Sequence, residues 1–361
     1  MTKPSVTTSI IGIDHARLQI DDVLRQFFDD ATEKASAISP YYEQLWQAMS
    51  RLTLSGGKRF RPYMTMLSYQ AFSSQSPDQV VNIAAAQELL HQALLIHDDI
   101  IDRDSIRYGV KNVSKQYEEI YEPLIADVVE RRHFSDGAAL LAGDLLIAAG
   151  YQLIRKSHLS AEQIIQANDI FDRALFVVAG GELLDVESSF RTADTTDAIA
   201  IARYKTAHYS FVTPIIMGAT LGGASPSTIA HLESFGEQVG IAYQLVDDLL
   251  GVFGDSSQTG KTDIGDIEEG KRTFLIEQFE RMATDEQRAQ MNEVFGKKNT
   301  GDHGAAQART LLIESGAKGH VEDTIAMYRA NAERLLEEVD LPQHVLLTLQ
   351  GLINKALDRI K

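Results

Sequence analysis

Apolar residues recur at helical spacing along almost the whole chain, and stretches of alternating β-branched residues bounded by turn residues are nearly absent. This pattern predicts an all-α protein. Two segments, residues 81–101 and the later part of 229–252, are apolar nearly all round. Because such helices are surrounded by other helices, we expect these two to be central.

The remaining pattern predicts further helices separated by short breaks rich in Gly, Ser and Asp. The helices are expected at residues 14–36, 41–52, 61–73, 161–190, 197–221, 271–280, 285–295, 305–314 and 317–339, with breaks at 55–57, 74–78, 222–227 and 254–270. No break is long enough for an interdomain linker, so residues 1–361 are expected to form a single domain. A charged segment near residues 117–133 is expected to be a surface insertion between two core helices.

Charge and cysteine content exclude several classes of function. The formal net charge of -17 argues against a nucleic-acid surface, which needs a basic stripe. The chain has no cysteine, which excludes disulfides, thiolate nucleophiles and cysteine-ligated metal centres, and favours a cytoplasmic location. A chain this acidic would also repel a polyanionic substrate unless metal ions or local cations reversed the sign at the site.

Neither a secretory signal nor a transmembrane segment is predicted. The first twenty residues lack a basic start followed by an unbroken apolar run. The most apolar stretch, residues 138–154, is short for a membrane span and contains Asp144 and Gln152. We interpret it as a buried core helix.

The first apolar helix ends in an acidic cluster, His-Asp-Asp-Ile-Ile-Asp at residues 97–102. Asp98 and Asp102 are four residues apart and lie on one helical face, whereas Asp99 points about a quarter turn away. Carboxylates in the last turn repel one another and face the negative end of the helix dipole, so a positive partner is expected. Hard oxygen ligands in this number favour magnesium shared with substrate phosphates.

A second apolar helix ends in the same way, with Asp247 and Asp248 followed by Leu-Leu-Gly-Val-Phe-Gly-Asp. Two such helices side by side would direct two carboxylate clusters at one cleft. That geometry suits metal ions that hold one diphosphate.

Cationic residues accompany both acidic motifs. The segment Gly-Gly-Lys-Arg-Phe-Arg-Pro at residues 56–62 places Lys58 and Arg61 near a predicted helix start, where backbone N–H groups also favour anions. Arg107, Lys205 and Lys261 are further cations near the acidic motifs or helix breaks. His91 lies seven residues before Asp98, on nearly the same helical face. Together with two metal clusters, these residues predict a site for two diphosphates.

In this order, the motifs resemble those of the trans-prenyltransferase family, the head-to-tail isoprenyl diphosphate synthases. The resemblance covers residues 56–271 and includes Gly181 to Asp185, Lys205-Thr206-Ala207 and Gly260-Lys261 as well as both aspartate motifs. It implies an all-α, single-domain helical bundle around a central cavity. It further implies a homodimer, three magnesium ions, and as substrates an allylic diphosphate and isopentenyl diphosphate.

The resemblance also implies a role for each matching residue. Asp98, Asp102 and Asp247 would hold metal, Arg107, Lys205 and Lys261 would contact the allylic diphosphate, Lys58, Arg61 and His91 would contact isopentenyl diphosphate, and Thr206 and Gln244 would face the reacting carbons. The chain departs from the family pattern at Tyr108, where a second arginine is usual, at Gly251 and at Glu182.

The chemistry of prenyl transfer explains why aspartates and cations occur together. Ionisation of an allylic C–O bond releases diphosphate, so fixed positive charge lowers the barrier, and a dry apolar wall must keep water from the carbocation. No histidine or carboxylate is an obvious base for the final proton loss, and in the family the departing diphosphate is thought to serve. Family members that stop at fifteen carbons usually have an aromatic residue where this chain has Ala93 and Leu94, so a product of twenty carbons or more is predicted.

Two alternatives remain open from the sequence. A class I terpene cyclase also uses an aspartate cluster and magnesium, but it binds one diphosphate and would not need Lys58, Arg61 and His91. A non-catalytic partner subunit with the same fold would be expected to have lost metal-binding aspartates, which this chain keeps.

Overall fold

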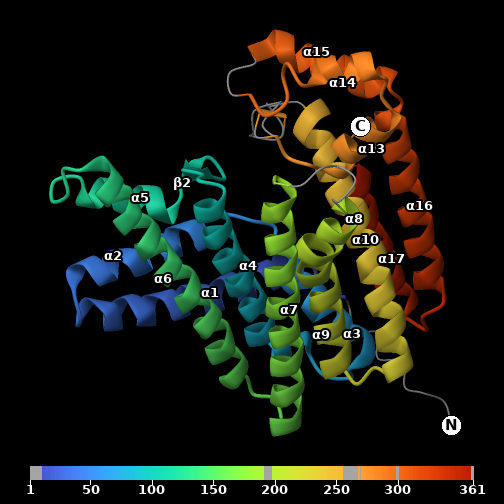
Figure 1. Ribbon diagram of the computed structural model, residues 1–361. Coiled ribbons are helices and arrows are strands. Elements are labelled where there is room, and N and C mark those ends of the chain that lie inside the picture. The colour runs from blue at the N-terminus through green and yellow to red at the C-terminus, as the bar shows by residue number, and fades with distance from the viewer. Residues whose placement is uncertain (1–9, 191–196, 255–266, 269, 298–300, 359–361) are drawn as a thin grey trace. The chain divides into compact units, whose positions relative to one another are not determined.

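The computed structural model describes residues 10–190, 197–254, 267–268, 270–297 and 301–358. These residues are almost entirely helical (Figure 1), which confirms the predicted all-α class. The chain divides into two compact units, Met1–Asp169 with Met217–Gly223, and Ile170–Ile216 with Ala224–Lys361. The expectation of a single domain stays a prediction.

The first unit contains the helices of the first half of the chain and one small hairpin (Figure 1). Its elements are α1 (Ile13–Ser36), α2 (Pro40–Leu54), α3 (Phe60–Phe72), the 3-10 helix η1 (Pro77–Val80), α4 (Val81–Ile101), β1 (Ile106–Arg107), β2 (Val110–Lys111), α5 (Val113–Tyr121) and α6 (Val128–Arg155), with parts of α7 (Ala161–Ser188) and α9 (Thr213–Leu221).

Helix α4 is the centre of this unit, as its all-round apolar sequence predicts. It packs against α1, α3 and above all α6. Gly143 on α6 permits the close approach, because a Cβ atom there would lie 2.1 Å from the His97 ring. Helices α2 and α6 of the same unit begin at local signals: Ser39 caps α2 with Pro40 in the first turn, and Asp127 caps α6.

The charged segment near residues 117–133 differs in part from expectation. Its middle is exposed, but Tyr117 is buried in α5 and its hydroxyl donates a hydrogen bond to the carbonyl of Tyr41. Tyr121 stacks on Tyr117 and contacts Phe134 on α6, with ring centroids 4.4 Å apart. The aromatic residues among the charges therefore fix α5 on α2 and α6 instead of leaving it as a surface excursion.

A two-residue β-hairpin follows α4 and returns the chain toward the acidic cluster. Arg107 pairs with Val110 across the turn, and Tyr108 and Gly109 both have positive φ, 54° and 76°. This is the geometry of the mirror-image turns that match strand twist. Tyr108, at the position where the resembled family has arginine, is thus a turn residue with a side chain 65% exposed.

The second unit is built around α10. Its elements are most of α7, α8 (Ala198–Ile201), the π-helix η3 (Ala202–Val212), the start of α9, α10 (Pro226–Phe253), α13 (Phe274–Met282), α14 (Asp285–Met291), α15 (Gly301–Glu314), α16 (Ala317–Glu337) and α17 (Gln343–Leu357). Helix α10 begins at a Ser225 cap with Pro226 in the first turn, and it packs against η3 and α16.

The single helix expected at residues 197–221 is helical throughout, but its centre is a π-helix. Glycines on both neighbours allow it to approach closely. A Cβ atom at Gly181 of α7 would lie 2.2 Å from the Lys205 nitrogen, and one at Gly240 of α10 would lie 2.4 Å from the Ala207 Cα. Segments of this kind are rare and often mark functional sites.

One described helix, Val128–Arg155, has the length and apolar composition that a membrane crossing requires, with half of its most apolar window buried in the structure. Core helices of soluble proteins meet the same criterion. The predicted absence of a transmembrane segment stays a prediction.

Candidate active site

The acidic end of α4 has the positive partner that the sequence predicts, and it is Arg107. The guanidinium Nη2 lies 3.0 Å from Oδ2 of Asp98, and Nε donates to Oδ1 of Asp99 at 2.7 Å. Asp104 is 3.7 Å away. Asp102 caps the C-terminus of α4 and is exposed. The hairpin thus returns one cation to a helix end that carries several carboxylates.

Asp99 differs from its two neighbours in the motif because it is only 2% exposed. Burial raises the pKa of Asp99 to about 6, although Arg107 opposes the shift. Its Oδ2 accepts no hydrogen bond within the described part of the chain. Asp99 therefore anchors Arg107 on the protein side of the cluster, whereas Asp98 and Asp102 are the more accessible carboxylates.

The predicted isopentenyl diphosphate residues lie in the same unit. Lys58 is exposed, Arg61 is half-buried at the start of α3, and His91 is buried on α4. Burial lowers the pKa of His91 well below its usual value, and the positive charges of Arg61, Arg107 and Arg59 lower it further. A neutral imidazole near several guanidinium groups describes an environment suited to an anion.

In the second unit, α7 holds Lys205. The Nζ atom lies 2.6 Å from Oδ2 of Asp185 and 3.0 Å from Oε2 of Glu182. Glu182 is one of the departures from the family pattern, and its carboxylate gives Lys205 a second acidic partner where the usual glutamine would be neutral. The ammonium is thus fixed at the side of α7 by two ion pairs.

Thr206 and Gln244 form a hydrogen-bonded chain in the second unit. The Thr206 hydroxyl donates to the Gln244 carbonyl oxygen at 2.6 Å, and the Gln244 amide donates to Oδ1 of Asp248 at 2.8 Å. Asp248 is buried, while Asp247 is half-buried on α10. These two hydrogen bonds, to Thr206 on the π-helix and to Asp248 on α10, fix the orientation of the Gln244 amide.

The predicted residues therefore form two groups. Asp98, Asp102, Arg107, Lys58, Arg61 and His91 belong to the first unit, and Lys205, Thr206, Gln244 and Asp247 to the second. The predicted convergence of both aspartate motifs on one cleft stays a prediction. Lys261 lies outside the described residues.

The carboxylates fit a metal shared with a substrate better than a closed metal cage. Among the described residues, no three His, Asp or Glu side chains are grouped so that they could hold an ion by themselves. Asp98 and Asp102 offer hard oxygen donors one helical turn apart, and magnesium is commonly held by one or two carboxylates together with phosphate oxygens. The donor set on the chain therefore fits magnesium.

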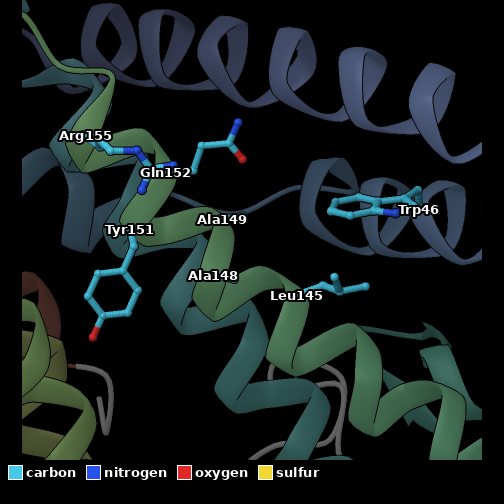
Figure 2. Close-up of a pocket in the computed structure, with 7 residues that line it drawn as sticks. All are labelled: Trp46, Leu145, Ala148, Ala149, Tyr151, Gln152 and Arg155. Atoms are coloured by element: carbon cyan, nitrogen blue, oxygen red, sulfur yellow. The ribbon is translucent and has the colours of Figure 1, made fainter.

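A pocket of about 510 Å³ lies apart from these residues, between α2 and α6 of the first unit (Figure 2). Trp46 contributes from α2 and all the other lining residues come from α6: Leu145, Ala148, Ala149, Tyr151, Gln152 and Arg155. It contains none of the predicted site residues.

Comparison with known proteins places the chain in a family. Residues 42–312 match the polyprenyl synthetase family, and the chain belongs to it. This confirms the sequence-based identification as a trans-prenyltransferase.

The chain is similar to geranylgeranyl diphosphate synthase of Sulfolobus acidocaldarius, at 34% identity over 268 residues, 73% of this chain and 75% of the relative. It is 30% identical to geranylfarnesyl diphosphate synthase of Aeropyrum pernix over 328 residues, 88% and 95% of the two chains. Among solved structures it resembles geranylgeranyl pyrophosphate synthase of Corynebacterium glutamicum complexed with isoprenyl diphosphate and magnesium, with a TM-score of 0.89, 31% identity, and coverage of 97% of this chain and 100% of that one.

Several residues of these groups were not assigned from the sequence. Asp99, Asp185 and Asp248 each hold a predicted site residue in place, and all three stand inside motifs that the sequence did identify. Their proximity in sequence to the predicted residues was the available signal. It could not distinguish a ligand from a residue that orients one.

Replacement of Gly181 with Ala is expected to lower kcat/KM for the allylic diphosphate by roughly tenfold or more. The added Cβ would lie 2.2 Å from the Lys205 backbone nitrogen, so the π-helix must shift and displace Lys205 and Thr206. Gly180→Ala is the matched control, because a Cβ there meets nothing within 4 Å. Steady-state kinetics at varied allylic diphosphate tests this, and equal activity of the two variants would contradict it.

Proposed function

We propose that this chain is a magnesium-dependent prenyl diphosphate synthase that joins an allylic diphosphate to isopentenyl diphosphate. Its products are a trans-prenyl diphosphate of twenty carbons or more and diphosphate. One observation carries the proposal: α4 bears the Asp98 and Asp102 carboxylates and, on nearly the same face, His91 with Arg61 near it. The first unit thereby offers carboxylates for a metal-bound diphosphate and, near them, cations for a second diphosphate.

The chain's own residues divide the work between binding and orientation. Lys205 and Arg107 neutralise diphosphate oxygens as the allylic C–O bond breaks, which lowers the barrier to ionisation. Lys58, Arg61 and His91 hold isopentenyl diphosphate so that its double bond faces the carbocation. Thr206 and Gln244, oriented by Asp248, line the path of the reacting carbons.

Magnesium bound by Asp98, Asp102 and Asp247 together with the diphosphate would neutralise the leaving charge. The donor chemistry and the magnesium and isoprenyl diphosphate complex of the Corynebacterium glutamicum relative support the use of a divalent metal. We propose three ions, as the resemblance implies, and a cytoplasmic location.

The product length follows from the residues one turn before Asp98. Leu94 is half-buried and shares the face of Asp98, whereas Ala93 is fully buried in the core. Relatives named geranylgeranyl and geranylfarnesyl diphosphate synthase support a product of twenty carbons or more. The absence of an aromatic ring at Leu94 leaves that face open to a long chain.

We further propose that the chain is a homodimer in which α6 faces its copy. Phe134, Leu141 and Ala148 are spaced seven residues apart and all are exposed on one face of α6. Ala148 also lines the pocket beside Trp46. A helix of this apolarity with an uncovered face is the kind of surface that a stable interface buries.

Replacement of Asp98 with Ala is expected to reduce turnover by roughly a thousandfold, because the leaving diphosphate loses its metal ligand. The assay combines isopentenyl diphosphate with allylic diphosphates of ten, fifteen and twenty carbons and magnesium, followed by chromatography of the dephosphorylated products. Asp22→Ala on the exposed face of α1 is the control.

If the wild-type chain condensed none of the starters, the enzyme would be excluded and the partner-subunit alternative favoured. A cyclic hydrocarbon would favour the terpene cyclase. Unchanged turnover in Asp98→Ala would show that the metal assignment is wrong.

Leu94→Phe is expected to shorten the product toward fifteen carbons, because the ring would fill the face one turn, about 6 Å, before Asp98. Leu18→Phe on exposed α1 is the control for the same change. Ala93→Phe should instead lower stability by about 1–3 kcal/mol through overpacking, since Ala93 has no exposed surface. Product chromatography and thermal unfolding measure the two effects, and an unaltered product from Leu94→Phe would contradict the assignment.

Leu141→Glu is expected to convert the dimer to a monomer, because a charge buried without a partner opposes association. Leu18→Glu is the matched control, since the two leucines are similarly exposed at 59% and 60%. Sedimentation velocity gives the masses. A monomeric wild-type chain, or a Leu141→Glu variant that stays dimeric, would rule out this interface.

A further inference from the structure

Arg59 is a buried arginine that follows the two glycines and Lys58 at the start of α3, and it has no role in the function proposed above. It is 3% exposed, yet each side of its guanidinium has a partner. Nε donates to Oδ1 of Asp21 at 2.7 Å, and Nη1 donates to Oε1 of Glu88 at 2.7 Å. Nη2 donates to the carbonyl of Thr53 at 2.8 Å. One side chain therefore joins α1, α4 and the end of α2.

The backbone around Arg59 adopts a conformation that residues other than glycine rarely adopt. Arg59 itself has φ 47° and ψ 42°, the left-handed region that non-glycine residues rarely adopt. Gly56 and Gly57 before it also have positive φ, 154° and 114°. A Cβ atom at Gly57 would lie 3.3 Å from Nη1 of Arg59, so the loop wraps around the guanidinium.

The ion pairs of Arg59 are better explained by the geometry that they fix than by a gain in stability. Burial lowers the pKa of Arg59, but Glu88 and Asp21 more than offset the shift, so the pKa is raised and the guanidinium stays charged. Buried ion pairs contribute little net stability and are better explained by the fixed geometry that they impose on the segments they join. The planar guanidinium, with several donors in fixed directions, imposes such a geometry better than a lysine ammonium would.

The network connects the loop to the turn of α4 that carries His91. Glu88 lies three residues before His91, so the two share a face of α4. Lys58 precedes Arg59 directly and Arg61 follows two residues later. The guanidinium thus ties the segment that bears both cations to the helix that bears the histidine.

We propose that Arg59 is a positioning residue that fixes Lys58 and Arg61 relative to His91 and thereby sets the affinity for isopentenyl diphosphate. The inference rests on the proposed function, because it deepens the role of one of its two diphosphate sites. The network touches neither Asp98 nor Asp102. Loss of the network therefore affects the two substrates unequally.

Arg59→Lys keeps the charge and removes the fork. The KM for isopentenyl diphosphate is expected to rise by about tenfold or more, whereas the KM for the allylic diphosphate changes by less than about twofold. Arg51→Lys is the matched control, because Arg51, on the exposed side of α2, donates hydrogen bonds to Gln116 and lies outside the Arg59 network. A purely structural role would reduce the melting temperature and the active fraction, hence kcat, without this split between the two KM values, and that result would overturn the proposal.

Glu88→Gln is a milder second variant in case Arg59→Lys folds poorly. The amide oxygen still accepts from Nη1 but without its charge, so the KM for isopentenyl diphosphate should rise by about threefold. Circular dichroism and thermal unfolding check the fold. Equal changes in both KM values, or no change in either, would overturn the proposal.

Calorimetric titration with isopentenyl diphosphate in the absence of magnesium separates this inference from the proposed function. A wild-type chain that binds isopentenyl diphosphate but forms no product would overturn the function and leave the role of Arg59 testable. Weaker binding by Arg59→Lys than by Arg51→Lys would support that role. Absence of binding by the wild-type chain would overturn it.

Discussion

The end of α4 sets the conditions for the predicted site residues of the first unit, because several carboxylates lie there at the negative end of a buried helix. Such an arrangement persists only if positive charge compensates it. Arg107 provides that charge, and the tight hairpin after α4 brings Arg107 back to the end of the helix. Asp99 holds the guanidinium from the buried side, which leaves Asp98 and Asp102 as the outer carboxylates available to a metal. The acidic cluster, the hairpin and Arg107 therefore depend on one another. In the proposed function, a metal ion bound with a diphosphate would add to the same compensation of charge.

The helices and the candidate site residues were predicted from the sequence, but most contacts between those residues were not. Helices such as α1, α4 and α10 were predicted closely, since long apolar periodicity is a local signal. Predicted site residues came from motif spacing, and the structure adds the residues that orient them, Asp99, Asp185 and Asp248. Asp99 and Asp248 lie only eight and four residues from Arg107 and Gln244, but spacing cannot distinguish a ligand from a residue that orients one. Asp185 contacts Lys205 from another helix, twenty residues away, which a helical period does not indicate. The π-helix at Lys205 was missed for the same reason, because it depends on the glycines of two neighbouring helices.

Both units place cations of the predicted site against fixed carboxylates. Arg107 contacts Asp98 and Asp99, Lys205 contacts Asp185 and Glu182, and Arg59 contacts Asp21 and Glu88. In a chain of net charge -17, a cation held in this way keeps its position before the substrate arrives. Preorganised charge of this kind lowers a barrier without reorganisation at the moment of reaction. The acidic character of the chain is therefore compatible with a polyanionic substrate, because the carboxylates fix the cations that we propose bind the anion or position the residues that do.

Tyr108 limits which residues can contribute to the proposed isopentenyl diphosphate site. It occupies a turn position with positive φ and an exposed side chain, where the resembled family has a second arginine. Without that cation, binding of the anion in the proposed site would depend more heavily on Lys58, Arg61 and His91. Fewer charges tolerate less error in their placement, since each remaining contact carries a larger share of the binding free energy. The ion pair between Arg59 and Glu88 connects the loop rigidly to α4. A site with fewer cations needs such a connection to keep the remaining ones in place.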